Sequence, residues 1–224
     1  EVWMQPKWWG ILGLIGWSYL ICALLFLWSS GRITALVASF FVLMGLNAVA
    51  HSGWLDSLAA LRSVTAAVGD GSMPAMVMAG AITTQVYRKS GFRTLLFYAL
   101  AASLALVICG LATRPYWEIS KIRATPPWTM ICTGISLTTF AVLVYATDIR
   151  GKVRWYEWIR PAGVSTLTCF LLPFIHDALL QTVDYRLPLA LRTGVTGLAK
   201  SMVFALLIIA VAGWLLKRRI WLKL

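Results

Sequence analysis

The sequence predicts an all-α protein, a polytopic bundle of about seven transmembrane helices. Sixty per cent of its 224 residues are hydrophobic and only 12% are charged, against roughly 25% charged residues in soluble domains. The mean hydropathy is +0.79. Apolar stretches long enough to cross a hydrocarbon core, which takes about 20 residues, recur along the whole chain between short polar connections. Together these observations indicate an integral membrane protein.

The predicted spans follow one another from the N-terminus to the C-terminus. They cover residues 9–28, 33–50, 73–87, 94–112, 128–147, 165–181 and 195–216. Most are continuous apolar stretches. The third span is short and begins in the sequence "GDGSMP", where we expect Ser72 to cap the helix and Pro74 to lie in its first turn.

The sixth span is interrupted by Pro173, His176 and Asp177. We nevertheless expect a helix, because the apolar residues 169–175 would otherwise form irregular backbone exposed to lipid. Pro173 leaves a backbone carbonyl without its helical partner and loosens the end of the span. We therefore expect His176 and Asp177 to face an outer cavity between helices.

Loop charges orient the predicted bundle. If the C-terminus is cytoplasmic, 12 of the 20 lysines and arginines lie on that side: Arg32, Arg88, Lys89, Arg93, Arg150, Lys152, Arg154, Arg160, Lys217, Arg218, Arg219 and Lys223. The positive-inside rule then predicts a cytoplasmic C-terminus and, with seven spans, an N-terminus on the outer side of the membrane. Because the chain opens "EVWMQPKWWG", we expect residues 1–224 to be one transmembrane domain from the C-terminal part of a longer chain.

The sequence contains none of the common soluble catalytic signatures, such as GxSxG, HExxH or a phosphate-binding glycine loop. The net charge of +12 resides in loops, which argues against a nucleic-acid partner. The four cysteines, Cys22, Cys109, Cys132 and Cys169, fall within predicted spans and form neither a disulfide framework nor a metal motif. We expect them to fill space between helices.

Polar residues in or beside membrane spans are costly and are therefore candidates for function. In the predicted orientation they gather on the outer side: His51, Asp56, Asp70, Lys121, Arg123, His176 and Asp177. Each also has an ordinary interpretation, for example Asp70 as a helix cap and Lys121 or Arg123 as contacts to lipid headgroups. His176 is either a base or substrate ligand, or a histidine satisfied by a neighbouring helix.

Three stretches carry a resemblance: "RPYWEISKIRATPPWTMICTGISLTTFAVLVYATDIRGK", "WIRPAGVSTLTCFLLPFIHDAL" and the last helix closing on "KRRIWLKL". They resemble the C-terminal half of heparan-alpha-glucosaminide N-acetyltransferase and of its bacterial membrane relatives. The resemblance implies a transmembrane enzyme of the bacterial inner membrane. Such an enzyme moves an acetyl group from cytoplasmic acetyl-CoA to a terminal glucosamine on the other side.

The resemblance also assigns residues. It implies substrate contacts from Lys121 or Arg123 and from Trp128 at the start of the fifth span, and from Asp70 and His176. The family's catalytic histidine lies in its N-terminal half, so we expect no catalytic residue in this chain. We expect His176 to hold the acceptor, with Asp177 or Asp70 fixing its tautomer. The catalytic half would come from the missing N-terminal part or from a partner chain, and a homo-oligomer is also compatible.

The loop "DIRGKVRWYEWIR" is the predicted contact for acetyl-CoA, because Arg150, Lys152, Arg154 and Arg160 can meet its phosphates. Anionic lipid is the alternative partner for these four side chains. Two other function classes remain open, a transporter or channel half with polar groups such as Asn47 and Gln85 along its path, and a non-catalytic structural domain. No metal is expected.

Overall fold

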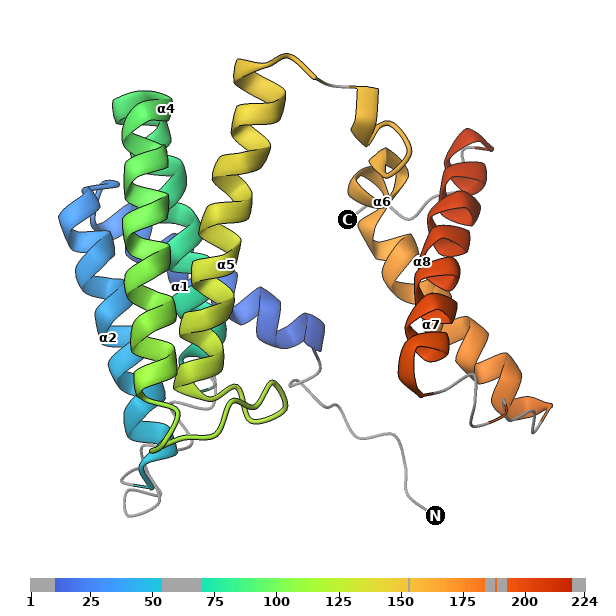
Figure 1. The fold of residues 1–224 in the computed structure, drawn as a ribbon, viewed down its shortest axis with the longest axis horizontal. Coiled ribbons are helices and arrows are strands. Elements are labelled where there is room, and N and C mark those ends of the chain that lie inside the picture. Colours follow the sequence, from blue (N-terminus) through green and yellow to red (C-terminus); the bar gives the residue numbers. More distant parts are fainter. Residues whose placement is uncertain (1–10, 54–69, 153, 184–187, 189–192, 219–224) are drawn as a thin grey trace. The chain divides into compact units, whose positions relative to one another are not determined.

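The computed structural model describes residues 11–53, 70–152, 154–183, 188 and 193–218. Every regular element among them is helical, which confirms the predicted all-α class (Figure 1). The elements are α1 (Ile11–Trp28), α2 (Ile33–His51), α4 (Ser72–Ala112), α5 (Pro126–Val144), the π-helix η2 (Tyr145–Ile149), the 3-10 helix η3 (Arg154–Tyr156), α6 (Arg160–Val164), α7 (Thr166–Thr182) and α8 (Gly194–Lys217).

Four of these helical segments are long and apolar enough to cross a membrane. They are α2, α4, α5 with its π-helical extension (Pro126–Ile149), and α8. Their surfaces carry large exposed apolar side chains, such as Phe97, which is 76% exposed, and Leu198, which is 72% exposed. Apolar surface on this scale is suited to lipid rather than to water. The chain is therefore an integral membrane protein by the length and composition of its helices.

Helix α4 is a hairpin of two helices. Its 41 residues would extend over about 60 Å as one straight helix, twice the thickness of a hydrocarbon core of about 30 Å. Gly91 interrupts it with φ 76° and ψ −174°, a backbone conformation that glycine adopts without steric cost. The halves 72–90 and 92–112 run side by side (Figure 1), and Tyr98 of the second half lies close to Thr83 of the first. These halves contain the two helices predicted at 73–87 and 94–112.

Contacts divide the chain into two compact units, Glu1–Arg150 and Gly151–Leu224. The core of the first unit lies between α2 and the first half of α4, where Leu36, Phe40, Met78 and Ile82 are buried. Cys22 of α1 packs against this core and its thiol donates to the Pro74 carbonyl, 3.2 Å away. All four cysteines are free, as predicted. The single domain predicted over residues 1–224 stays a prediction.

Small residues bring α5 close to the second half of α4. A Cβ added at Gly134 would lie 3.0 Å from the Ser103 carbonyl oxygen. A Cβ added at Gly110 would lie 2.8 Å from the Ile131 side chain and 3.1 Å from the Pro127 carbonyl oxygen. The two helices are thus in near-backbone contact, which fixes α5 along the hairpin and positions both of its ends.

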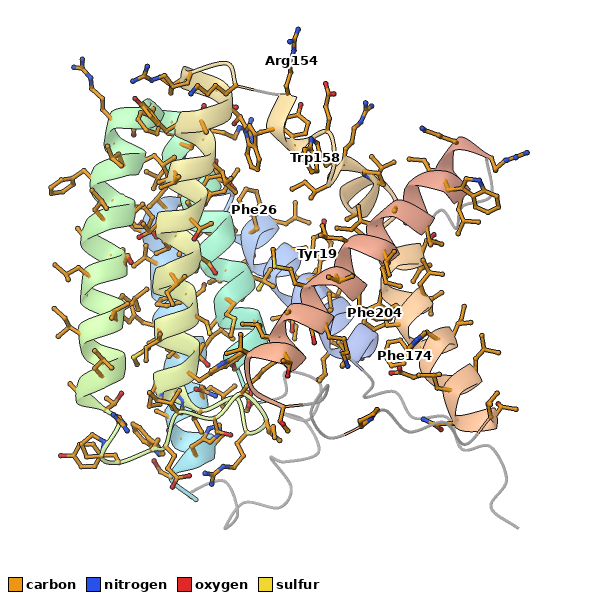
Figure 2. All side chains as sticks on the ribbon, turned by 45° about the vertical axis from the view of Figure 1, so that its right-hand side comes forward. Tyr19, Phe26, Arg154, Trp158, Phe174 and Phe204 are labelled. Carbon is orange, nitrogen blue, oxygen red and sulfur yellow. The ribbon has the colours of Figure 1, made fainter. Side chains whose placement is uncertain are left out.

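The second unit contains α6, α7 and α8. The predicted helix at 165–181 is present as α7, with Pro173 inside it, and the helix predicted at 195–216 is present as α8. Gly213 of α8 approaches Pro161 of α6, where an added Cβ would lie 3.1 Å from the proline ring. Figure 2 shows the Arg154 side chain extending away from the ribbon of this unit.

Candidate functional site

Polar side chains gather at one end of the first unit, where α2 ends, α4 begins and the 113–125 connection turns back into α5. We call this the polar end cluster. Its members are Asn47, His51, Asp70, Ser72, Thr125 and Thr129. Three of the predicted site residues are at this cluster, since His51 and Asp70 belong to it and Arg123 contacts it through its backbone. Asp56 lies outside the described residues.

His51 links α2 to the 113–125 connection. Its Nδ1 lies 2.8 Å from the Asn47 carbonyl oxygen and its Nε2 lies 2.7 Å from the Arg123 carbonyl oxygen. The Nδ1 atom also lies 3.5 Å from the Asn47 amide nitrogen. Through these contacts His51 orients the connection against the end of α2.

Asn47 is the buried centre of the cluster, with no exposed side-chain surface. Its amide nitrogen donates to the carbonyl oxygens of Asp70, 3.0 Å away, and Ala124, 3.1 Å away. Its amide oxygen is buried and has no hydrogen-bond partner within the described part of the chain. Asn47 therefore joins three segments that are far apart in the sequence.

Asp70 accepts a hydrogen bond on Oδ1 from the backbone N–H of Ser72, 3.0 Å away. Burial raises the pKa of its carboxyl group, and the Ser72 N–H and the nearby charge of His51 oppose that rise. The N–H contact agrees with the interpretation of Asp70 as a residue that satisfies the start of a helix. Oδ1 is engaged in this way, whereas Oδ2 has no hydrogen-bond partner in the part of the chain that the structure describes.

The expected cap at Ser72 was wrong. Gly71 is the N-cap residue, with φ 82° and no side-chain cap. A Cβ at Gly71 would lie 2.6 Å from the Leu43 carbonyl oxygen, so this close approach to α2 requires glycine. The Ser72 hydroxyl instead pairs with Thr129 of α5, 2.7 Å away. Pro74 lies in the first turn, as predicted.

The 113–125 connection presents its charges outward. The Arg123 guanidinium binds the Glu118 carboxylate at 2.8 Å, and both side chains are largely exposed. Lys121 is exposed and Trp128 is half-buried. Thr125 fixes the connection by donating to the Glu118 carbonyl, 2.7 Å away. Arg123 thus contacts the cluster through its backbone carbonyl and not through its charged side chain. The identity of a residue in the sequence does not predict such a backbone contact.

The opposite end of the first unit is basic. We call Arg32, Arg88, Lys89, Arg93 and Arg150 the basic end. Lys89 donates to the Gly31 carbonyl at 3.2 Å, and Tyr87 donates to the Asp148 carboxylate at 2.9 Å, which ties the hairpin turn to η2. Arg150 donates to the Tyr145 hydroxyl at 2.7 Å and lies 5.3 Å from the centre of that ring. Lys152, Arg154 and Arg160 are exposed in the second unit.

His176 and Asp177 lie together on α7. The His176 Nδ1 is 3.2 Å from the Asp177 carboxylate, and 43% and 67% of the two side-chain surfaces are exposed. The His176 ring also packs against Phe204 of α8, with 4.7 Å between ring centres. Asp177 therefore lies within reach of His176, one of the two carboxylates that could fix its tautomer. The acceptor-binding role of this pair stays a prediction.

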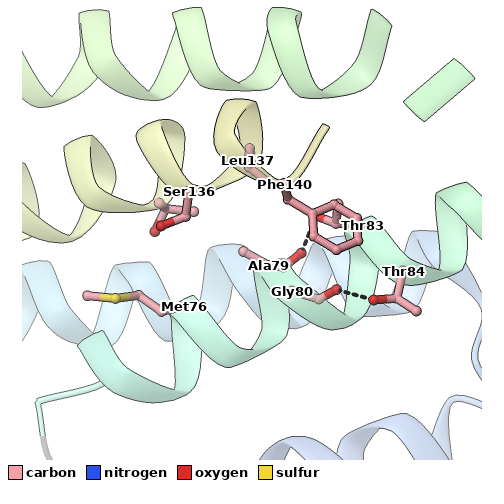
Figure 3. A pocket seen from close by; sticks show the side chains of 9 residues that line it. Met76, Ala79, Gly80, Thr83, Thr84, Ser136, Leu137 and Phe140 are labelled. Carbon is pink, nitrogen blue, oxygen red and sulfur yellow. Dashed lines mark hydrogen bonds between the residues drawn. The ribbon is translucent and has the colours of Figure 1, made fainter. Parts of the chain in front are cut away.

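A cavity in the first unit has no counterpart among the features predicted from the sequence. It has a volume of about 350 Å³ and lies between the first half of α4 and α5 (Figure 3). The residues that line it are Met76, Ala79, Gly80, Thr83, Thr84, Thr133, Ser136, Leu137 and Phe140. Their spacing of three and four residues on each helix was the available signal. That spacing alone does not distinguish a cavity wall from a packed interface.

These features define the class of the protein: a helical integral membrane protein with a polar and a basic end in its first unit. No protein-family model, no curated protein and no solved structure matches this chain.

Proposed function

We propose that this chain is part of a transmembrane acyltransferase of the bacterial inner membrane, which moves an acetyl group from cytoplasmic acetyl-CoA to a terminal glucosamine outside. In this proposal the chain crosses the membrane seven times, with the N-terminus outside and the C-terminus in the cytoplasm. The observation that supports it is the chemical difference between the two ends of the first unit. The resemblance described above supplies the particular donor and acceptor.

The basic end suits the donor. Acetyl-CoA carries several phosphates, and arginine binds phosphate through paired N–H groups. Arg150 is held by the Tyr145 hydroxyl and ring, so part of its side-chain entropy is already lost before a phosphate binds. Lys152, Arg154 and Arg160 would add charge from the same loop. Anionic lipid headgroups compete for the same side chains.

The polar end cluster suits the acceptor. The first half of α4 joins it to the basic end over about 28 Å, at 1.5 Å per residue, close to the thickness of a hydrocarbon core. The Oδ2 of Asp70, which bonds none of the residues that the structure describes, can accept a hydrogen bond from a sugar amine or hydroxyl. Lys121, Arg123 and Trp128 belong to the same end of the first unit and would surround the acceptor. The resemblance separately assigns an acceptor contact to His176, beside Asp177 in the second unit.

The test is acetyl transfer across a bilayer. The purified full-length protein is placed in liposomes with radiolabelled acetyl-CoA on one side and glucosamine on the other, and N-acetylglucosamine is measured. The proposal expects product on the glucosamine side. A properly inserted wild-type protein that yields no acetylated amine contradicts it.

Two sets of variants separate the ends. Changing Arg150, Lys152, Arg154 and Arg160 to glutamine should raise the KM for acetyl-CoA and leave the KM for glucosamine unchanged. His176→Ala should raise the KM for glucosamine by about fivefold to 100-fold, the effect of losing one contact, and leave the KM for acetyl-CoA unchanged. Arg114→Gln, an exposed arginine outside both sets, is the control. Equal effects of all three on both KM values would contradict the assignment.

A further inference from the structure

We call the cavity lined by the nine residues named above the α4–α5 groove. It lies between the first half of α4 and α5, near the middle of both helical segments. Its residues run from Met76 to Thr84 on the first half of α4 and from Thr133 to Phe140 on α5. These ranges centre near the middle of segments 72–90 and Pro126–Ile149. Figure 3 shows Ser136 and Phe140 of α5 beside the first half of α4. Its volume of about 350 Å³ falls in the range of small-molecule sites, roughly 300–1,000 Å³.

The hydroxyl groups of the groove are arranged to accept hydrogen bonds. Thr84 donates its proton to the Gly80 carbonyl at 3.0 Å, and Thr133 donates to the Thr129 carbonyl at 2.7 Å. Each hydroxyl oxygen therefore keeps lone pairs for another donor. Thr83 has the same bond to its own helix and in addition contacts Tyr98. Ser136 has no hydrogen-bond partner among the residues that the structure describes.

The remaining lining is apolar and carries no charge. Met76, Leu137 and Phe140 contribute large apolar side chains, and neither a lysine, an arginine nor a carboxylate lines the groove. An ion at mid-height would lack a partner, and an unpaired charge at that depth is costly. The groove therefore favours a neutral ligand with an apolar body and at least one O–H or N–H.

We infer that the α4–α5 groove binds a neutral, lipid-like alcohol or amide, whose polar group donates to the exposed hydroxyl group of Thr84 or Ser136. Such a molecule reaches this depth from the bilayer, since Thr84 and Ser136 are exposed on the first unit. The inference rests on the groove alone and is independent of acetyl transfer.

The experiment compares two photoactivatable probes on the full-length protein in lipid nanodiscs. One is hexadecanol and the other is hexadecane, each with a diazirine at the same carbon. The expected result is saturable labelling of the peptides that contain residues 76–84 and 133–140, about fivefold stronger with the alcohol, the factor that one net hydrogen bond supplies. Equal labelling by both probes shows that bulk lipid tails fill the groove and overturns the inference.

Variants test the hydroxyl groups and the space separately. Thr84→Val with Ser136→Ala keeps the shape and should reduce labelling by the alcohol to the level of the alkane. Thr139→Val is the control, because Thr139 is exposed on the same helix, bonds only its own helix and does not line the groove. Unchanged alcohol labelling in the double variant contradicts the inference.

Gly80→Leu should block labelling by both probes. A Cβ at Gly80 meets no atom within 4 Å, so the new side chain enters open space rather than displacing a helix. Gly45→Leu is the matched control, because Gly45 of α2 is likewise exposed and a Cβ added there meets no atom within 4 Å. This variant should be labelled by both probes to the same extent as the wild-type protein. Absence of labelling in the wild-type protein shows that another segment occupies the groove, and this too overturns the inference.

Discussion

At the scale of single residues, buried amide and carbonyl groups determine the polar end cluster. Asn47 is fully enclosed and donates to two carbonyl oxygens that belong to different segments. His51 contacts a third segment through the Arg123 carbonyl. These bonds hold the start of α4 and the 113–125 connection against the end of α2.

Asn47→Ala should therefore lower the melting temperature. It leaves the carbonyl oxygens of Asp70 and Ala124 without their donor, and each such loss costs about 1–3 kcal/mol when the group stays buried. Thermal unfolding in detergent measures the change. Ser52→Ala, which removes an exposed bond within the same helix, should have little effect. A melting temperature equal to that of the wild type would show that Asn47 does not hold the cluster.

Asp70 should make stability depend on pH. Burial raises its pKa above the ordinary value of 3.8, so the folded protein retains a proton that the unfolded chain has already released. The contribution of Asp70 to the free energy of unfolding therefore falls as the pH rises above 3.8 and through the raised pKa of the folded state. Asp70→Asn keeps an oxygen for the Ser72 N–H and should reduce that slope in melts between about pH 4 and 6. An identical slope in the variant contradicts the burial effect.

At the scale of elements, the predicted boundaries of α2, α5 and α8 are close to those observed, because continuous apolar stretches and flanking polar residues define them. Asp70 at the start of α4 was likewise recognisable from its position. Ser72 was misassigned because its hydroxyl bonds Thr129, 57 residues away. Contacts such as that pair, or His51 with the Arg123 carbonyl, depend on helix packing that a single sequence does not specify.

Two glycine-to-alanine substitutions should change the stability of the protein in opposite directions, because only one of the glycines lies at the close contact between α5 and the hairpin. Gly134→Ala adds a Cβ 3.0 Å from the Ser103 carbonyl oxygen, a backbone atom that cannot easily move, and should lower the melting temperature. Gly45→Ala meets no neighbouring atom and should raise stability by about 0.5–1 kcal/mol through helix propensity. Stabilisation by both changes would show that α5 is not packed this closely.

At the scale of the whole molecule, the account depends on the two ends of the first unit lying on opposite sides of a membrane. Four helical segments have the length and composition to cross it. The excess of lysine and arginine in the predicted cytoplasmic loops predicts the orientation that we propose. Acetyl transfer from a cytoplasmic donor to an outside acceptor is possible only if this arrangement holds.

Cysteine labelling in intact cells tests this claim most directly. Ser90 is exposed at the turn of α4 and Ser120 lies in the 113–125 connection at the other end. After removal of the four native cysteines, Ser90→Cys should react with a membrane-impermeant maleimide only once the inner membrane is opened. Ser120→Cys should react from the periplasm. Labelling of Ser90→Cys from the periplasm, or of both positions from the same side, would contradict the proposed arrangement.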